Sequence, residues 1–149
     1  MTKIAENKMT SAIFKVIRTS QDDFALGCSA GMYFTVYDSR FKKFIKQPEF
    51  FMVDHVVTQL IEISPNRFAV GCWNVPWIAI VDKKQRTLIR IDCPLSDETQ
   101  CTDLVPLPGF NPRMFPFILQ RNNKAVNLVN LATLTMNRLL MRPNQQGSF

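Results

Sequence analysis

Four cysteines and a single histidine are the residues of this chain best suited to metal binding or nucleophilic chemistry. A structural zinc site needs four Cys or His ligands, which usually come in closely spaced pairs such as C-x-x-C. Cys28, Cys72, Cys93 and Cys101 contain no such pair, and His55 is the only imidazole. We therefore expect no metal site and no cofactor. We also expect reduced thiols, because no secretion signal precedes them.

Acid–base catalysis would have to use His55 or paired carboxylates. His55 follows Asp54 at the start of an expected strand, a position that we interpret as structural. The pairs Asp22-Asp23 and Asp97-Glu98 fall in turn-like segments, where Asp favours the local backbone geometry. The sequence contains no Gly-rich phosphate loop, no G-x-S-x-G elbow and no H-E-x-x-H motif. We predict that the protein has no catalytic residues and is not an enzyme.

Basic residues recur with a regular spacing. Arg90 follows Lys46 by 44 positions, and Arg138 follows Arg90 by 48. Such residues guard the edge strands of sheets against unwanted pairing, which is the interpretation that we favour. They also bind nucleic acid when aromatic side chains lie nearby. This alternative is supported by residues 104–149, which contain five Lys or Arg and no Asp or Glu.

Two tryptophans bracket a short turn. Trp77 begins an apolar segment, so we interpret it as a core residue. Trp73 is followed by Asn74 in the turn itself, and tryptophan is enriched at the centres of protein interfaces. We therefore predict Trp73 and Asn74 as partner-binding residues, with Lys46, Arg90 and Arg138 as a second candidate set.

An internal repeat positions these residues. The segment "DFALGCSAGMYFTVYD" at 23–38 returns as "RFAVGCWNVPWIAIVD" at 67–82, and a weaker third copy contains "NLVN" at 127–130. Cys28 and Cys72 match in the first two copies, as is typical of small buried strand residues. Turn residues divide each copy into four apolar segments, which predicts consecutive antiparallel hairpins. We expect strands at 11–19, 24–29, 33–38 and 43–47, then at 55–63, 67–72, 77–82 and 87–92, and finally at 101–107, 115–121, 125–130 and 134–139.

Four-stranded units that repeat every 40–50 residues or so are typical of β-propeller blades. The second copy, "HVVTQLIEISPNRFAVGCWNVPWIAIVD", resembles a WD repeat. It has a histidine, an apolar strand, Ser-Pro-Asn, a strand ending in Gly and an apolar strand ending in Asp. The family's Trp is replaced by Tyr37, Val81 and Val129 in the three copies. The resemblance implies an all-β fold, a partial β-propeller of three four-stranded antiparallel blades, and it implies no activity.

The repeat also predicts the organisation of the chain. We expect an N-terminal leader at 1–10, blades at 11–50, 51–95 and 96–140, and a flexible C-terminal tail at 141–149. No apolar stretch approaches the roughly 20 residues that span a bilayer, and the N-terminus lacks the apolar block of a signal peptide. We therefore expect a cytoplasmic protein that does not bind membranes.

Three blades are too few for a closed ring, since propellers use about four to eight. Because a blade buries its faces only against its neighbours, each end of the stack should expose an apolar face. We expect Phe14, Phe24, Phe34 and Tyr37 at one end, and Phe115, Phe117, Val126 and Leu128 at the other. The sequence thus predicts a non-catalytic protein–protein interaction or scaffold module. A protein partner or self-association would complete the propeller, so we expect no free monomer. The alternative is a nucleic-acid-binding module that uses the acid-free C-terminal third.

Overall fold

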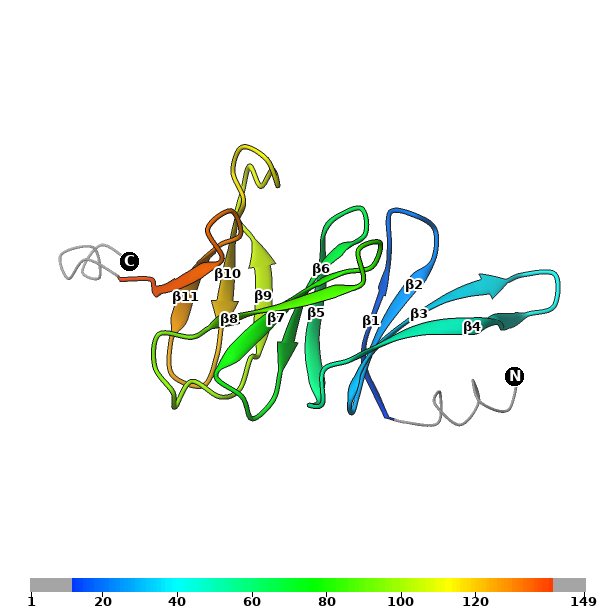
Figure 1. Cartoon of the computed structure of the whole chain (residues 1–149), viewed down its shortest axis with the longest axis horizontal. Helices are drawn as coiled ribbons and strands as arrows, with labels where there is room; N and C mark the ends of the chain where they lie inside the picture. Colours follow the sequence, from blue (N-terminus) through cyan, green and yellow to red (C-terminus); the bar gives the residue numbers. More distant parts are fainter. Residues whose placement is uncertain (1–11, 141–149) are drawn as a thin grey trace, which may run out of the picture.

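The chain folds into three antiparallel four-stranded sheets that stand side by side (Figure 1). The computed structural model describes residues 12–140, apart from the side chains of residues 44–49. Each sheet contains four strands that are consecutive in the sequence, and the sheets do not close into a ring. The expected fold class is therefore confirmed: this is an all-β chain that forms three blades of a partial β-propeller. No helix that could traverse a bilayer occurs between residues 12 and 140.

The twelve strands follow the repeat. Blade 1 contains β1 (Ile13–Arg18), β2 (Phe24–Cys28), β3 (Gly31–Asp38) and β4 (Lys43–Met52). Blade 2 contains β5 (Val57–Ser64), β6 (Arg67–Cys72), β7 (Trp77–Asp82) and β8 (Thr87–Asp92). Blade 3 contains β9 (Asp103–Pro106), β10 (Phe117–Arg121), β11 (Val126–Asn130) and β12 (Thr135–Arg138). The expected leader (1–10) and tail (141–149) lie outside the described residues.

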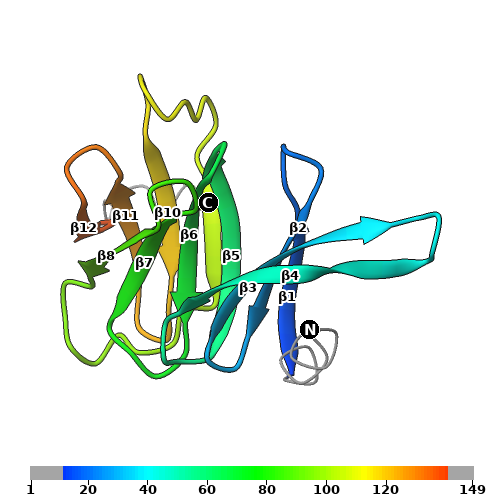
Figure 2. The same cartoon turned by 45° about the vertical axis from the view of Figure 1, so that its right-hand side comes forward.

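Strand β4 is longer than the sequence predicts. It continues to Met52 because the first half of β3 pairs with it beyond an irregularity between Phe34 and Val36. The hairpin of β3 and β4 projects away from the rest of the chain (Figures 1 and 2). Strand β9, by contrast, ends early at Pro106, and a loop with its own bridge between Asn111 and Phe115 delays the start of β10.

The recurring Asp or Asn of the repeat begins a turn. The side-chain oxygens of Asp38, Asp82 and Asn130 accept hydrogen bonds from the backbone N–H groups of Arg40 (3.0 Å), Gln85 (2.9 Å) and Ala132 (2.9 Å), respectively. Four positions after the Asp or Asn, the backbone is left-handed at Lys42 (φ 53°), Arg86 (φ 56°) and Leu134 (φ 59°). Asp and Asn favour such turns because their short side chains bond to the nearby backbone. The Asp or Asn that recurs in every copy of the repeat is therefore a turn residue.

The two most similar copies differ in register. Phe24 of β2 pairs with Thr35, whereas the matching Phe68 of β6 pairs with Val81, the counterpart of Tyr37. The shift is two residues, and an even shift keeps every side chain on its own face of the sheet. In blade 2 the difference lengthens the loop between β6 and β7 to residues 73–76, which contain Trp73.

Two apolar cores lie between the blades. The core between blades 1 and 2 is rich in aromatic residues: Phe34, Phe51, Phe68 and Trp77. The core between blades 2 and 3 is mostly aliphatic: Ile63, Ile78, Ile80, Ile91, Leu104, Ile118, Val129 and Leu131. Blade 2 is covered on both faces, as its nearly continuous apolar strands predict.

One expectation about the end faces is wrong. Phe34 is 3% exposed and lies between blades 1 and 2, with its ring centroid 4.9 Å from that of Phe68. Successive strand residues point to opposite faces, so Tyr33 is the residue that faces outward. Tyr33 forms a buried cluster with Leu26 and Cys28, against which Phe50 packs.

Candidate interaction site

Trp73 lies in a loop whose backbone is firmly held. Its N–H donates to the carbonyl oxygen of Val56 (2.9 Å), and it forms a bridge with Gln100 in the linker between β8 and β9. The next residue, Asn74, has a left-handed backbone (φ 70°). The Trp73 side chain is 51% exposed, whereas Trp77 is 7% exposed, which confirms that Trp77 is a core residue. Trp73 therefore combines a fixed backbone with an accessible ring.

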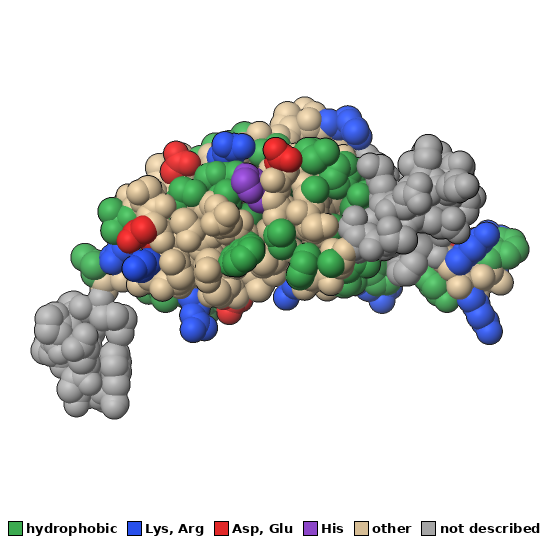
Figure 3. All heavy atoms as spheres, turned by 90° about the horizontal axis from the view of Figure 1, so that it is seen from below, with side chains coloured by type: hydrophobic (Ala, Val, Ile, Leu, Met, Phe, Trp, Pro, Cys, Tyr) green, Lys and Arg blue, Asp and Glu red, His purple; other side chains and the backbone are tan. Residues whose placement is uncertain are grey.

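Figure 3 shows the end of the blades to which this loop belongs. His55, the only purple side chain, lies on this end among hydrophobic side chains. Its ring stands edge-on to Trp77, with 5.5 Å between the centroids. No group of three or more potential metal ligands occurs among the described residues.

Two of the basic residues predicted as a second contact set, Arg90 and Arg138, have partners within the chain. The guanidinium of Arg90 lies 4.2 Å from the ring centroid of Trp77. Two further cations of blade 2, Lys83 and Arg86, cover Phe34 (4.7 Å) and Phe51 (5.6 Å) in the same manner. These cations close one side of the aromatic core between blades 1 and 2, since a cation is attracted to the face of an aromatic ring. The side chain of Lys46 lies outside the described residues.

Arg138 occupies the same repeat position as Arg90. Arg90 pairs with Ala79 across the sheet of blade 2, and Arg138 pairs with the matching Asn127 in blade 3. The Arg138 guanidinium, however, lies 3.2 Å from a carboxylate oxygen of Glu98. Arg138 is thus the counterion of a buried acid.

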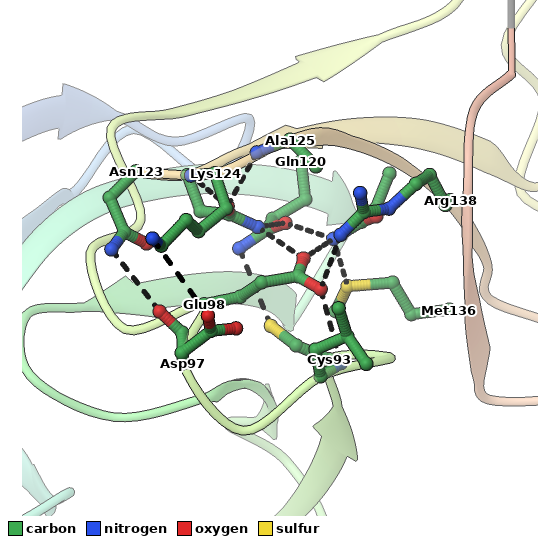
Figure 4. A network of polar contacts seen from close by, with 12 residues as sticks. Cys93, Asp97, Glu98, Gln120, Asn123, Lys124, Ala125, Met136 and Arg138 are labelled. Atoms are coloured by element: carbon green, nitrogen blue, oxygen red, sulfur yellow. Dashed lines mark hydrogen bonds and ion pairs between the residues drawn. The ribbon is translucent and has the colours of Figure 1, made fainter.

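Glu98 is the centre of a polar network between blades 2 and 3 (Figure 4). Its side chain is 0% exposed. One carboxylate oxygen accepts hydrogen bonds from the amide groups of Asn122 (2.8 Å) and Asn127 (2.7 Å). The other accepts from Arg138 and from the backbone N–H of Leu95 (3.1 Å). The carboxylate therefore has two donors on each oxygen, which compensates for its removal from water.

Gln120 extends the network toward the aliphatic core. Its side-chain oxygen accepts from Asn122 (2.9 Å) and Asn127 (3.0 Å), and its amide nitrogen lies 3.7 Å from the sulfur of Cys93. Asn127 Oδ1 is buried and has no hydrogen-bond partner within the described part of the chain. The network joins the linker between β8 and β9 to β10, β11 and β12.

The pKa values of the titratable groups in this network suit a structural role. Burial has the largest effect on the pKa of Glu98 and raises it, but the hydrogen bonds from Asn127, Asn122 and Arg138, with the charge of Arg138, outweigh burial. The pKa of Glu98 is therefore below its usual value, and the carboxylate stays ionised. Burial also raises the pKa of Cys93 to about 12, so its thiol stays protonated at neutral pH. Neither group is suited to proton transfer or nucleophilic attack near pH 7.

Sequence reasoning missed this network because it placed Asp97-Glu98 in a turn-like segment. A signal was present in the third copy. Asn127 stands where the second copy has Ala79, and Gln120 also lies in an otherwise apolar strand. Polar residues at core positions of one copy indicate a buried polar partner, because such groups are costly without one.

The outer face of blade 3, which points away from blade 2, is apolar and open. We define it by six side chains of β9, β10, β11 and the segment after β12: Val105, Phe117, Leu119, Val126, Leu128 and Leu139. Val126 is 36% exposed, whereas its counterpart in blade 2, Ile78, is 0% exposed beneath blade 3. The expected exposure of this end of the stack is therefore confirmed.

Comparisons with known proteins identify no family. No family model matches the sequence, and no curated protein does. Among solved structures, the chain is similar to apo AztD from Citrobacter koseri, with a TM-score of 0.48 and 15% sequence identity. The similarity covers 78% of this chain and 30% of the AztD chain. The assignment to partial β-propellers therefore rests on the three sheets themselves.

Proposed function

We propose that this chain is a non-catalytic protein–protein interaction or scaffold module. Its blades belong to a larger propeller or assembly, and another sheet covers the outer face of blade 3. The observation that carries the proposal is the contrast within the repeat. Positions that blade 3 buries on blade 2, such as Ile78 at 0% exposure, recur on blade 3 with Val126 at 36%.

Energetic considerations support this reading. Burying apolar surface contributes about 25 cal/mol per Å², and a stable interface usually covers on the order of 800 Å² on each partner. A contiguous apolar sheet face is a common mark of an interaction site. Leu119 at its centre pairs across the sheet with Val105 on one side and Leu128 on the other. The face thus has the continuous apolar centre that such an interface needs.

Trp73 and Asn74 provide a second contact on the loop end of the blades. A large side chain on a fixed backbone loses little conformational entropy on binding, which favours Trp73 as an anchor. The proposal also includes the finer assignment to WD-repeat-like propellers, for which the motif order from His55 to Asp82 is the support, and a cytoplasmic location.

Nucleic-acid binding is the alternative from the sequence, and no contact of the described residues favours it. Two of the five basic residues beyond position 103 have acidic partners: Arg138 with Glu98, and Lys124 with Asp97 at 3.8 Å. The phosphate-binding charge available in this part of the chain is correspondingly smaller.

Site-specific photocrosslinking tests the proposal. A photoreactive amino acid at Val126 should give adducts with a protein when the full chain is irradiated in the cells that make it. The same residue at Ile89, which is a strand residue of similar exposure (45%), is the matched control and should give few. Adducts of equal yield at both positions, or none at Val126, would overturn the proposal.

A further inference from the structure

We propose that the β9–β10 part of the outer face of blade 3 is covered by the same part of a second copy of this chain. The two copies are related by a two-fold axis that runs between and parallel to β9 and β10. This inference rests on the proposed function and names the partner of that site.

The centre of the other end of the stack is closed, although Val16 of β1, on the same face, is 54% exposed. On the outward face of blade 1, Leu26 is 2% exposed, Cys28 is 1% exposed and Tyr33 is 4% exposed. Head-to-tail stacking, in which blade 3 of one copy meets blade 1 of the next, would have to open this buried cluster. A contact between two copies of blade 3 leaves it intact. It is also self-limiting, because a two-fold contact uses one surface twice.

The charges on the outer face are self-complementary. Asp103 of β9 and Arg121 of β10 are directly opposite each other in the sheet. Both face away from blade 2, because the neighbouring Leu104 and Gln120 are buried against blade 2. Within residues 12–140, neither side chain makes a hydrogen bond or an ion pair. The face therefore carries one unpaired acid beside one unpaired base.

A two-fold axis between β9 and β10 exchanges these two strands. It places Arg121 of each copy against Asp103 of the other, which forms two equivalent ion pairs. An axis perpendicular to the strands would instead bring the charged end of each face against the aromatic end that contains Phe117. Charge complementarity thus selects the parallel axis, because charges set the register of an interface.

The apolar side chains of β9 and β10 fit the same operation. Leu119 pairs with Val105 across the sheet, so exchange of the strands places Leu119 of each copy on Val105 of the other. The side chains of β11 and β12 on this face, among them Val126 and Leu128, lie beside the contact. The contact is therefore two strands wide in each copy.

The molar mass of the full chain tests this arrangement. Size-exclusion chromatography with light scattering, over a range of concentrations, should show a dimer. Arg121→Asp and Asp103→Arg should each raise the dimer dissociation constant at least tenfold, because each puts like charges together. The double variant should return it to within about threefold of the wild type. The matched charge reversal Lys84→Asp, in the exposed turn between β7 and β8, should leave it unchanged.

The outcomes separate this inference from the proposed function. A chain that stays monomeric while Val126 crosslinks to a different protein would overturn the inference and leave the proposed function standing. A monomer whose Val126 adduct joins residues 141–149 of the same chain would overturn both. A dimer that does not respond to the charge reversals would overturn the arrangement. Melting curves of the variants establish that each one is folded.

Discussion

The two blade interfaces of this chain come from the same repeat, but they differ in chemistry. Between blades 1 and 2, aromatic rings fill the core, and the cations of Lys83, Arg86 and Arg90 cover their faces. Between blades 2 and 3, aliphatic side chains fill the core, and the ionised Glu98 holds the polar end. The repeat thus determines where strands and turns lie. It does not determine which apolar and charged groups fill each interface.

This difference has a physical basis. An aromatic ring needs no hydrogen bond, so a cation that only covers its face, such as Arg90, contributes a modest attraction and can be removed at modest cost. Lys83, by contrast, also forms an ion pair with the buried Asp23. A buried carboxylate needs every donor around it, and each donor is left unpaired when the carboxylate is removed. We therefore expect the first interface to depend on volume and the second on hydrogen bonds.

The largest effect is expected in the aromatic core. Phe68→Ala should lower the free energy of unfolding by about 4 kcal/mol, because it leaves a cavity beside Phe34. Phe68 is 1% exposed, whereas Phe41 is 64% exposed, so Phe41→Ala is the matched control and should change stability by less than about 0.5 kcal/mol. Urea unfolding measures both. Similar losses in the two variants would show that the first interface does not depend on volume.

Removing the buried carboxylate should have the next largest effect. Glu98→Ala should lower the free energy of unfolding by about 3 kcal/mol, because the amides of Asn122 and Asn127 lose their acceptor in the interior. Glu98→Gln keeps the shape and one acceptor oxygen, and should cost about half as much. Urea unfolding of both variants provides the comparison. A loss below about 1 kcal/mol for Glu98→Ala would mean that the polar end of the second interface is dispensable.

Acid should weaken the second interface selectively. The pKa of Glu98 is lower in the folded chain than its usual value, so folding favours the ionised form. Its contribution is fully present above the unfolded pKa of about 4.3 and is lost as the pH falls through the folded value, at up to about 1.4 kcal/mol per pH unit. Glu98→Gln should remove this part of the pH dependence. Parallel stability curves for the wild type and this variant below pH 4 would contradict the assignment.

A smaller loss is expected for the cations over the aromatic core. Arg90→Ala should lower the free energy of unfolding by between about 0.5 and 1 kcal/mol, since the guanidinium lies over Trp77 at an exposed site. Lys84→Ala, in the adjacent turn, removes a cation that has no aromatic partner among the described residues, and should have no measurable effect. Thermal melts at two salt concentrations resolve the difference. An equal effect of both variants would show that the cation–ring contact does not stabilise the first interface.

The thiols should show the smallest difference between the interfaces. Burial raises the pKa of Cys72 beside the first interface and of Cys101 beside the second to about 12. Both should therefore resist a thiol reagent at pH 7 in the folded chain and react after denaturation, because the thiolate is the reactive form. Mass spectrometry of the labelled protein measures the extent at each position. Rapid labelling of either cysteine under native conditions would show that its interface opens readily.

Local chemistry explains which features the sequence predicts. The turns after Asp38 and Asp82 follow from the side chain bonding to its own backbone, so they are visible in a few residues. The matching positions of Arg90 and Arg138 follow from the repeat spacing alone, and the strand pairs confirm them. Both predictions need only the types and the spacing of residues along the sequence.

Features that depend on packing are harder to predict. Phe34 and Tyr33 are adjacent aromatic residues, and only the position of blade 2 decides which of them enters its core. The sequence places Glu98 in a turn because its side-chain partners lie 24 to 40 positions away, in β11, in β12 and in the turn after β10. No local pattern shows that these donors converge on one carboxylate.

The order of the strands also governs how the chain reaches its native state. Every hydrogen-bonded ladder joins strands that are neighbours in the sequence, so no sheet has to wait for a distant segment. Chains with such local connectivity fold faster than those whose strands pair over long separations. During synthesis each blade can form its ladder once its own four strands have left the ribosome. We expect assembly then to proceed by docking one finished sheet on the next.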